Sequence, residues 1–67
     1  MTVSLLNRET AVRRLEAQVR RIAWQRELID QLAENGQPTD MAREMMRTLE
    51  NTLSLMELDL RRYPMPR

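Results

Sequence analysis

ENGQPTD, residues 34–40, separates two long segments that each carry a helical pattern. Its Asn-Gly pair supplies Gly36, a residue suited to the left-handed conformation with which many helices end, and Pro38 prevents the helix from continuing. Thr39 is a favourable N-cap, and Asp40 suits the positively polarised first turn of a second helix. Because the connection is so short, we expect the two helices to be antiparallel neighbours.

Outside this turn, the first segment holds no Gly or Pro, and apolar residues recur three and four positions apart in both segments. This spacing is typical of amphipathic helices. We therefore predict one all-α domain over residues 1–67. Its parts are a helix over about 5–34, a turn at 35–38, a second helix over about 40–63 and a tail at 64–67.

Heptad positions a and d are apolar along the whole second segment, a pattern typical of coiled coils. That series is Ala42, Met46, Leu49, Leu53, Met56, Leu60 and Tyr63. The corresponding series in the first segment is Val12, Leu15, Val19, Ile22, Arg26, Ile29 and Ala33. When the chain folds back at the turn, the last residue of the first series faces the first residue of the second, and the pairing continues in this way toward the far end. The residue numbers of each facing pair sum to 75, as in 33 + 42. The sequence predicts a coiled-coil-like antiparallel hairpin with this seam.

The stretch VRRLEAQVRRIAWQ, residues 12–25, nearly repeats itself after seven residues. Its arginines fall on heptad positions that point away from the seam, where glutamates four residues earlier in the chain can pair with two of them. Arg26 is the charged residue of the seam, and we expect its guanidinium to reach Asp30 or Glu50. Binding of an anionic ligand by Arg26 is the alternative.

A two-helix chain of this length without cysteine has little core of its own, and such chains commonly associate. One flank of the predicted seam is charged, whereas the other is mostly apolar or uncharged. We expect the second flank to join two chains into a homodimeric four-helix bundle, with a different protein partner or a higher oligomer as alternatives. The predicted self-association residues are Leu28, Leu32, Met41, Met45, Thr52 and Leu55.

Trp24 and Leu58 occupy the outermost heptad positions. They are candidate anchors for another protein, because tryptophan is enriched among interface hot spots. For Trp24, the alternative is a place at the edge of the dimer interface.

The composition argues against an enzyme. Without His or Cys, the chain lacks the commonest general base, the thiol nucleophile and the usual transition-metal ligands. One glycine cannot form a glycine-rich phosphate loop. We predict no catalytic, cofactor-binding or metal-binding residues and no small-molecule substrate. No apolar run approaches the roughly 20 residues of a membrane span, and the absence of cysteine favours a reducing cytoplasm.

These features predict a non-catalytic protein–protein interaction module, a small homodimeric adaptor or regulator. The alternative is an RNA- or DNA-binding bundle, similar in architecture to the plasmid-copy-number RNA-binding hairpin dimers, in which an arginine strip contacts phosphates. That strip consists of Arg13, Arg14, Arg20 and Arg21. A net charge of +1 and only two aromatic residues weigh against nucleic acid. Acidic residues beside the arginines weigh against a membrane-surface helix.

The segment from about Leu15 to Arg62 has a Gly-x-x-Thr turn from Gly36 to Thr39. Around this turn lie Ile22, Gln25, Ile29, Leu32, Ala42-Arg43, Leu49-Glu50, Leu53, Leu55-Met56, Asp59 and Arg62. With these features, of which the turn is the most specific, the sequence resembles a set of small uncharacterised helical-hairpin proteins of rhizobia-like alpha-proteobacteria. The resemblance implies a hairpin in a bacterial cytoplasm and assigns no activity or site residues.

Overall fold

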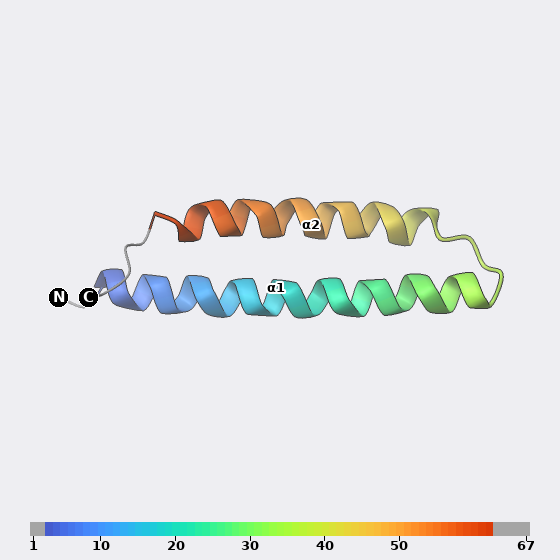
Figure 1. The fold of residues 1–67 in the computed structure, drawn as a ribbon, viewed down its shortest axis with the longest axis horizontal. Coiled ribbons are helices and arrows are strands. Elements are labelled where there is room, and N and C mark those ends of the chain that lie inside the picture. Colours follow the sequence, from blue (N-terminus) through green and yellow to red (C-terminus); the bar gives the residue numbers. More distant parts are fainter. Residues whose placement is uncertain (1–2, 63–67) are drawn as a thin grey trace.

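The computed structural model describes residues 3–62, with side chains from residue 8 onward. Two antiparallel helices, α1 (Val3–Glu34) and α2 (Asp40–Leu60), lie side by side and form a rod of 54 × 16 × 14 Å (Figure 1). The predicted all-α hairpin is confirmed. Helix α2 ends at Leu60, three residues before the predicted limit, and the predicted seam residue Tyr63 and tail 64–67 lie outside the described residues.

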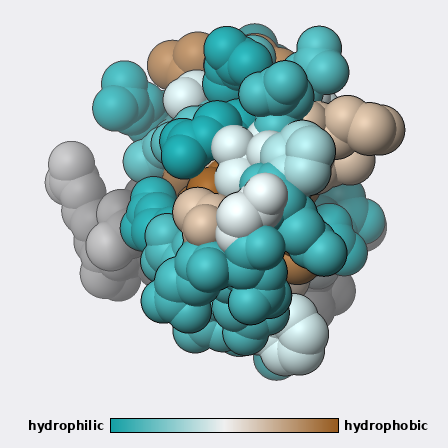
Figure 2. Space-filling model, turned by 90° about the vertical axis from the view of Figure 1, so that its right-hand side faces the viewer, coloured by the Kyte–Doolittle hydropathy of each residue, from teal (hydrophilic) through white to brown (hydrophobic). Residues whose placement is uncertain are grey.

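The turn closes α1 with a Schellman motif. Gly36 has a φ of 68°, its N–H donates to the carbonyl oxygen of Ala33 at 3.1 Å, and the N–H of Gln37 donates to that of Leu32 at 2.8 Å. These two bonds satisfy carbonyl groups that have no partner within the helix. Viewed from this end, the surface is mostly hydrophilic, and apolar atoms show in small separate patches between the hydrophilic side chains and at the margin (Figure 2).

Thr39 occupies the N-cap position of α2, as predicted, but its side chain makes no capping hydrogen bond. Its φ and ψ of −111° and 1° differ from the extended backbone that usually aims a capping side chain at the first turn. The Thr39 hydroxyl instead accepts a hydrogen bond from Nε of Arg43 at 3.0 Å. Asp40 lies in the first turn of α2, as predicted.

The core of the hairpin is small. Among the described side chains, the buried apolar ones are Ile22, Ile29 and Met46, and the half-buried residues packed against them are Ala42, Leu49 and Leu53. Each residue of the predicted α2 series from Ala42 to Leu60 is buried or half-buried, so this side of the seam is confirmed.

On α1, the predicted seam is wrong by one position. The inward residues are Ala11, Leu15, Gln18, Ile22, Gln25, Ile29 and Leu32. Val19, Arg26 and Ala33 of the predicted series are exposed, although Leu15, Ile22 and Ile29 are common to both series and Val12 is half-buried. The rotation keeps the guanidinium of Arg26 in solvent, because burying a charge costs far more than burying an amide that finds a hydrogen-bond partner.

The ion pair recorded among the described residues contributes little to the hairpin. In the described part of the chain, neither Glu9–Arg13 nor Glu16–Arg20, the pairs spaced for i,i+4 contact, lies within ion-pair distance. The ion pair that does form joins the exposed side chains of Arg62 and Asp59 at 3.4 Å, and exposed pairs of this kind add little stability. Neither helix, over the residues described, has an apolar stretch long enough to cross a membrane.

Candidate interaction face

Two glutamines of α1 bind the backbone of α2. Nε2 of Gln18 donates to the carbonyl oxygen of Leu49 at 2.8 Å, and Nε2 of Gln25 donates to that of Ala42 at 2.8 Å. Donors and acceptors are both seven residues apart, so the same contact repeats after one heptad. Each carbonyl oxygen has a second lone pair, so it can accept this bond in addition to its helical one. The side chain of Gln18 is only 2% exposed.

The predicted seam contained Val19 and Arg26 and so left these two glutamines outside it. A signal for their true position was present: a glutamine ends each copy of the seven-residue repeat in residues 12–25. The row Gln18, Gln25 and Leu32 also contains no charge, whereas the predicted row contained Arg26. The hydropathy pattern favoured Val19 over Gln18 as the inward residue. Hydropathy values do not account for a hydrogen bond between an amide side chain and a backbone carbonyl oxygen.

The rotation of α1 shapes the side of the hairpin that carries the exposed residues Leu28, Met41, Met45 and Leu55, which we call the apolar flank. An open groove of ≈ 600 Å³ is lined there by Ala17, Arg20, Arg21, Trp24, Gln25, Met45 and Leu49. Farther along α2, a second groove of ≈ 400 Å³ is lined by Thr52, Leu55, Met56, Leu58, Asp59 and Arg62. Two open, partly apolar grooves therefore extend along much of the apolar flank.

The predicted self-association residues differ in exposure. Exposed side chains are those of Leu28, Met41, Met45 and Leu55, with Met41 at 85%. Leu32 and Thr52 are half-buried, and Leu32 belongs to the inward row of α1. Several large apolar side chains exposed together on one flank are unusual for a small monomer and typical of an interaction surface.

Trp24 and Leu58, the predicted anchors, are both exposed, Trp24 at 78%. They line different grooves, so the structure does not bring them together. Trp24 borders the groove that also contains Met45, which favours its alternative role at the edge of the apolar flank. Leu58, on the outermost heptad position of α2, lines the second groove.

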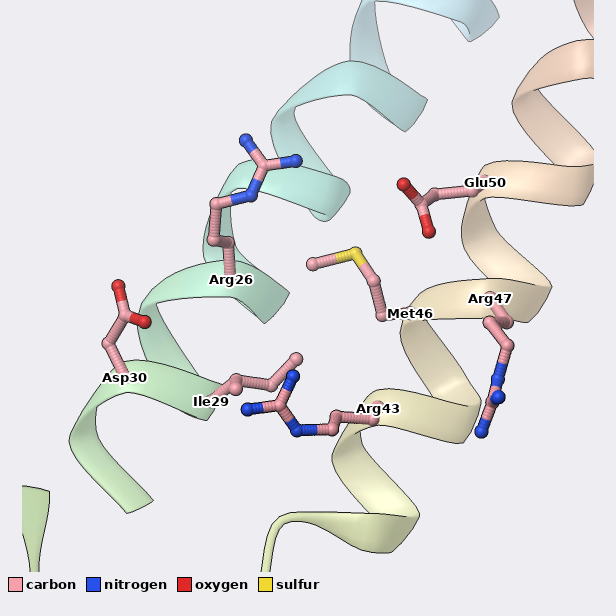
Figure 3. Close-up of a pocket in the computed structure, with 7 residues that line it drawn as sticks. All are labelled: Arg26, Ile29, Asp30, Arg43, Met46, Arg47 and Glu50. Atoms are coloured by element: carbon pink, nitrogen blue, oxygen red, sulfur yellow. The ribbon is translucent and has the colours of Figure 1, made fainter. Parts of the chain in front are cut away.

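The opposite side of the hairpin, the charged flank, holds an open pocket of ≈ 450 Å³ (Figure 3). Ile29 and Met46 point toward each other between the helices, in agreement with one predicted layer. The charged residues that line the pocket are Arg26, Asp30, Arg43, Arg47 and Glu50. Their guanidinium groups point in different directions, so the pocket does not concentrate positive charge on one point.

Arg26 does not pair with Asp30 or Glu50 within the described part of the chain, which corrects that prediction. All three side chains are exposed, so water solvates their charges. The described residues also contain no group of three or more His, Cys, Asp or Glu that could hold a metal ion.

The arginines of the predicted strip are exposed throughout: Arg13, Arg14, Arg20 and Arg21. Across the residues described, none of them forms an ion pair. Arg20 and Arg21 line the groove beside Trp24, so the strip borders the apolar flank.

The chain matches no protein-family model, no curated protein and no solved structure.

Proposed function

We propose that this chain is a non-catalytic protein–protein interaction module that acts as a homodimer, with the apolar flanks of two hairpins packed together as a four-helix bundle. The observation that carries the proposal is the set of exposed side chains on that flank, Leu28, Met41, Met45 and Leu55, beside a small buried core. A two-fold dimer is the simplest assembly for such a face, because the same patch serves both subunits.

The energetic argument is one of apolar area. Burying a large apolar side chain that water now reaches is worth about 1.5–3 kcal/mol when burial is complete. In a two-fold dimer every such side chain contributes twice. The charged flank offers no comparable gain, because covering Arg26, Asp30 or Glu50 would remove water from charges that form no ion pair among the described residues.

Self-association leaves the outward surface free for other contacts, and we propose that the dimer uses it as a small adaptor or regulator of another protein. Leu58 is an exposed apolar anchor there. A bacterial cytoplasm suits a chain without cysteine. A native pull-down that recovers a second protein from the parent, but not from Leu58→Glu, supports this role. Recovery of the chain alone contradicts it.

The dimer is tested by placing a charge on the apolar flank. We expect Met45→Glu to reduce the dimer fraction in sedimentation velocity at fixed concentration, because its carboxylate would be buried without a partner. Val19→Glu is the matched control, since Val19 is an exposed apolar residue one heptad before Arg26, on the side of the charged flank, and its substitution should leave the dimer intact. Equal association of Met45→Glu and the parent would overturn the proposal.

A second candidate function is contact with nucleic acid through Arg13, Arg14, Arg20 and Arg21, which are exposed and form no ion pairs among the described residues. Binding to mixed RNA should then fall steeply between low and moderate salt, because phosphate contacts release counterions. Arg13→Gln with Arg20→Gln should weaken binding uniformly across sequences. Binding that is absent or insensitive to salt excludes this function.

A further inference from the structure

The apolar flank changes character along the hairpin. Arg21 and Met45 line its first groove, and Thr52 and Asp59 line its second. On α1, Leu28 and Arg14 lie one heptad after and one heptad before Arg21, so they fall on the same side of the helix. Across the two helices these residues form three pairs whose numbers sum to 73 (28 + 45, 21 + 52, 14 + 59), as do those of Asp30 and Arg43, which line one pocket across the two helices. Paired residues therefore lie at similar levels along the rod.

These pairs form three layers of different chemistry. Nearest the turn, Leu28 and Met45 make an apolar layer. The middle layer combines Arg21 with the half-buried Thr52. The layer farthest from the turn is charged and holds Arg14. Because an α-helix rises about 1.5 Å per residue, the first and last layers are about 21 Å apart.

We infer that the second copy docks on the apolar flank with its turn at the same end, related by a two-fold axis that runs along the rod. The inference rests on the homodimer proposed above and specifies how its two chains are arranged. Such an axis places α1 of one protomer on α2 of its partner at the same level. Leu28 then packs on the partner's Met45, and Arg21 lies over the partner's Thr52.

The charged layer is complementary in this arrangement. Arg14 meets the partner's Asp59, and the symmetric contact forms on the other side of the axis. Asp59 already binds Arg62 at 3.4 Å, but its side chain is 57% exposed. A carboxylate has about four lone-pair sites, so it can also accept hydrogen bonds from a second guanidinium. Contacts of this kind fix orientation more than they add affinity.

The opposite orientation, with the two turns at opposite ends, is chemically mismatched. An axis across the middle layer would place Leu28 and Met45 against the partner's Arg14 and Asp59, which removes water from charges without supplying partners. It would also bring Arg21 close to the partner's Arg21, where like charges repel. The polarity of the flank therefore selects one orientation.

Spin-label distances test this arrangement directly, because a chain without cysteine accepts a single introduced thiol as a unique label site. Gln37→Cys places a nitroxide in the turn, away from the flank. The turn lies about 14 residues from the middle layer, so opposite turns would hold the two labels about 40 Å apart. Turns at the same end hold them within about 25 Å, the width of two adjacent hairpins of helices about 10 Å in diameter.

Asn51→Cys, an exposed position near the middle level, provides the matched control. Its two labels should lie close together in either orientation. A short distance at both positions supports the inference. A short distance at Asn51→Cys with about 40 Å at Gln37→Cys overturns the orientation and leaves the homodimer standing, whereas the absence of dipolar coupling at both positions overturns the homodimer itself. Glu34→Cys gives a second turn-end label if Gln37→Cys reduces helicity.

Discussion

Gln18 and Gln25, one heptad apart on α1, make the same 2.8 Å side-chain hydrogen bond to successive heptads of the α2 backbone, at Leu49 and Ala42. This repeated bond sets the rotation of α1 about its own axis. With the glutamines turned inward, Arg26 is exposed on the charged flank and Trp24 borders the apolar flank. The two faces of the hairpin thus follow from one pair of neutral polar residues.

Removing the buried amide should destabilise the protein. We expect Gln18→Ala to lower the free energy of unfolding by about 1–3 kcal/mol, because it removes a hydrogen bond and leaves a cavity beside Leu49. Urea unfolding followed by circular dichroism at one fixed protein concentration measures the change. Gln31→Ala, the same substitution at an exposed position of α1, should change stability by less than about 0.5 kcal/mol. Equal effects would show that Gln18 does not hold the helices together.

The observed rotation of α1 also predicts which neighbouring residues matter. Ile29→Ala should cost about 2–5 kcal/mol, because it empties part of the core. Arg26→Ala, three residues earlier, should change stability by less than about 0.5 kcal/mol, because its side chain is exposed and forms no ion pair among the described residues. Thermal or urea unfolding distinguishes the two. A large loss of stability in Arg26→Ala would show that Arg26 packs in the seam.

Much of the fold was predictable from local chemistry. Gly36 and Pro38 marked the turn, and the a/d series of α2 named its inward face correctly because every member is apolar. On α1, two rows of residues one position apart could face α2. Apolar content alone favoured the row that contains Val19 and Arg26. The choice depends on a hydrogen bond between a side chain and a backbone atom on another helix, which no local pattern specifies.

The candidate face was predictable in outline for the same reason. Leu28, Met41, Met45 and Leu55 are exposed on the flank that the sequence marked as uncharged. Leu32 and Thr52 are half-buried, Leu32 because the rotation of α1 draws it into the inward row. The sequence did not predict that Trp24 and Leu58 line different grooves, which only the structure shows.

In the turn, substitution should be costly at the position where φ is positive. Gly36→Ala is expected to cost about 1–2 kcal/mol, because φ at this position is 68° and a side chain disfavours that conformation. The added methyl group would meet nothing within 4 Å, so the cost comes from the backbone alone. Gly36→Asn should cost less, because asparagine adopts this conformation more readily. Chemical unfolding of both variants checks the order, and an alanine variant as stable as the parent would contradict it.

Trp24 provides an intrinsic probe of the apolar flank, because it is the single tryptophan of the chain. It is 78% exposed in one hairpin, and association should partly cover its indole ring. We expect its emission maximum to shift to shorter wavelength as the protein is concentrated. Met45→Glu should suppress the shift, whereas Val19→Glu, on the side of the charged flank, should not. A spectrum independent of concentration across the dimerisation range would place Trp24 outside the interface.

Sedimentation equilibrium over a concentration series, with helicity measured by circular dichroism on the same samples, tests the central claim most directly. The chain has a mass of 8.0 kDa, and the account predicts a helical species of twice that mass. Dilution should reduce mass and helicity together, because the small core of one hairpin depends on its partner. A fully helical monomer at every concentration would contradict the account, since the hairpin would then be stable with its apolar flank in water.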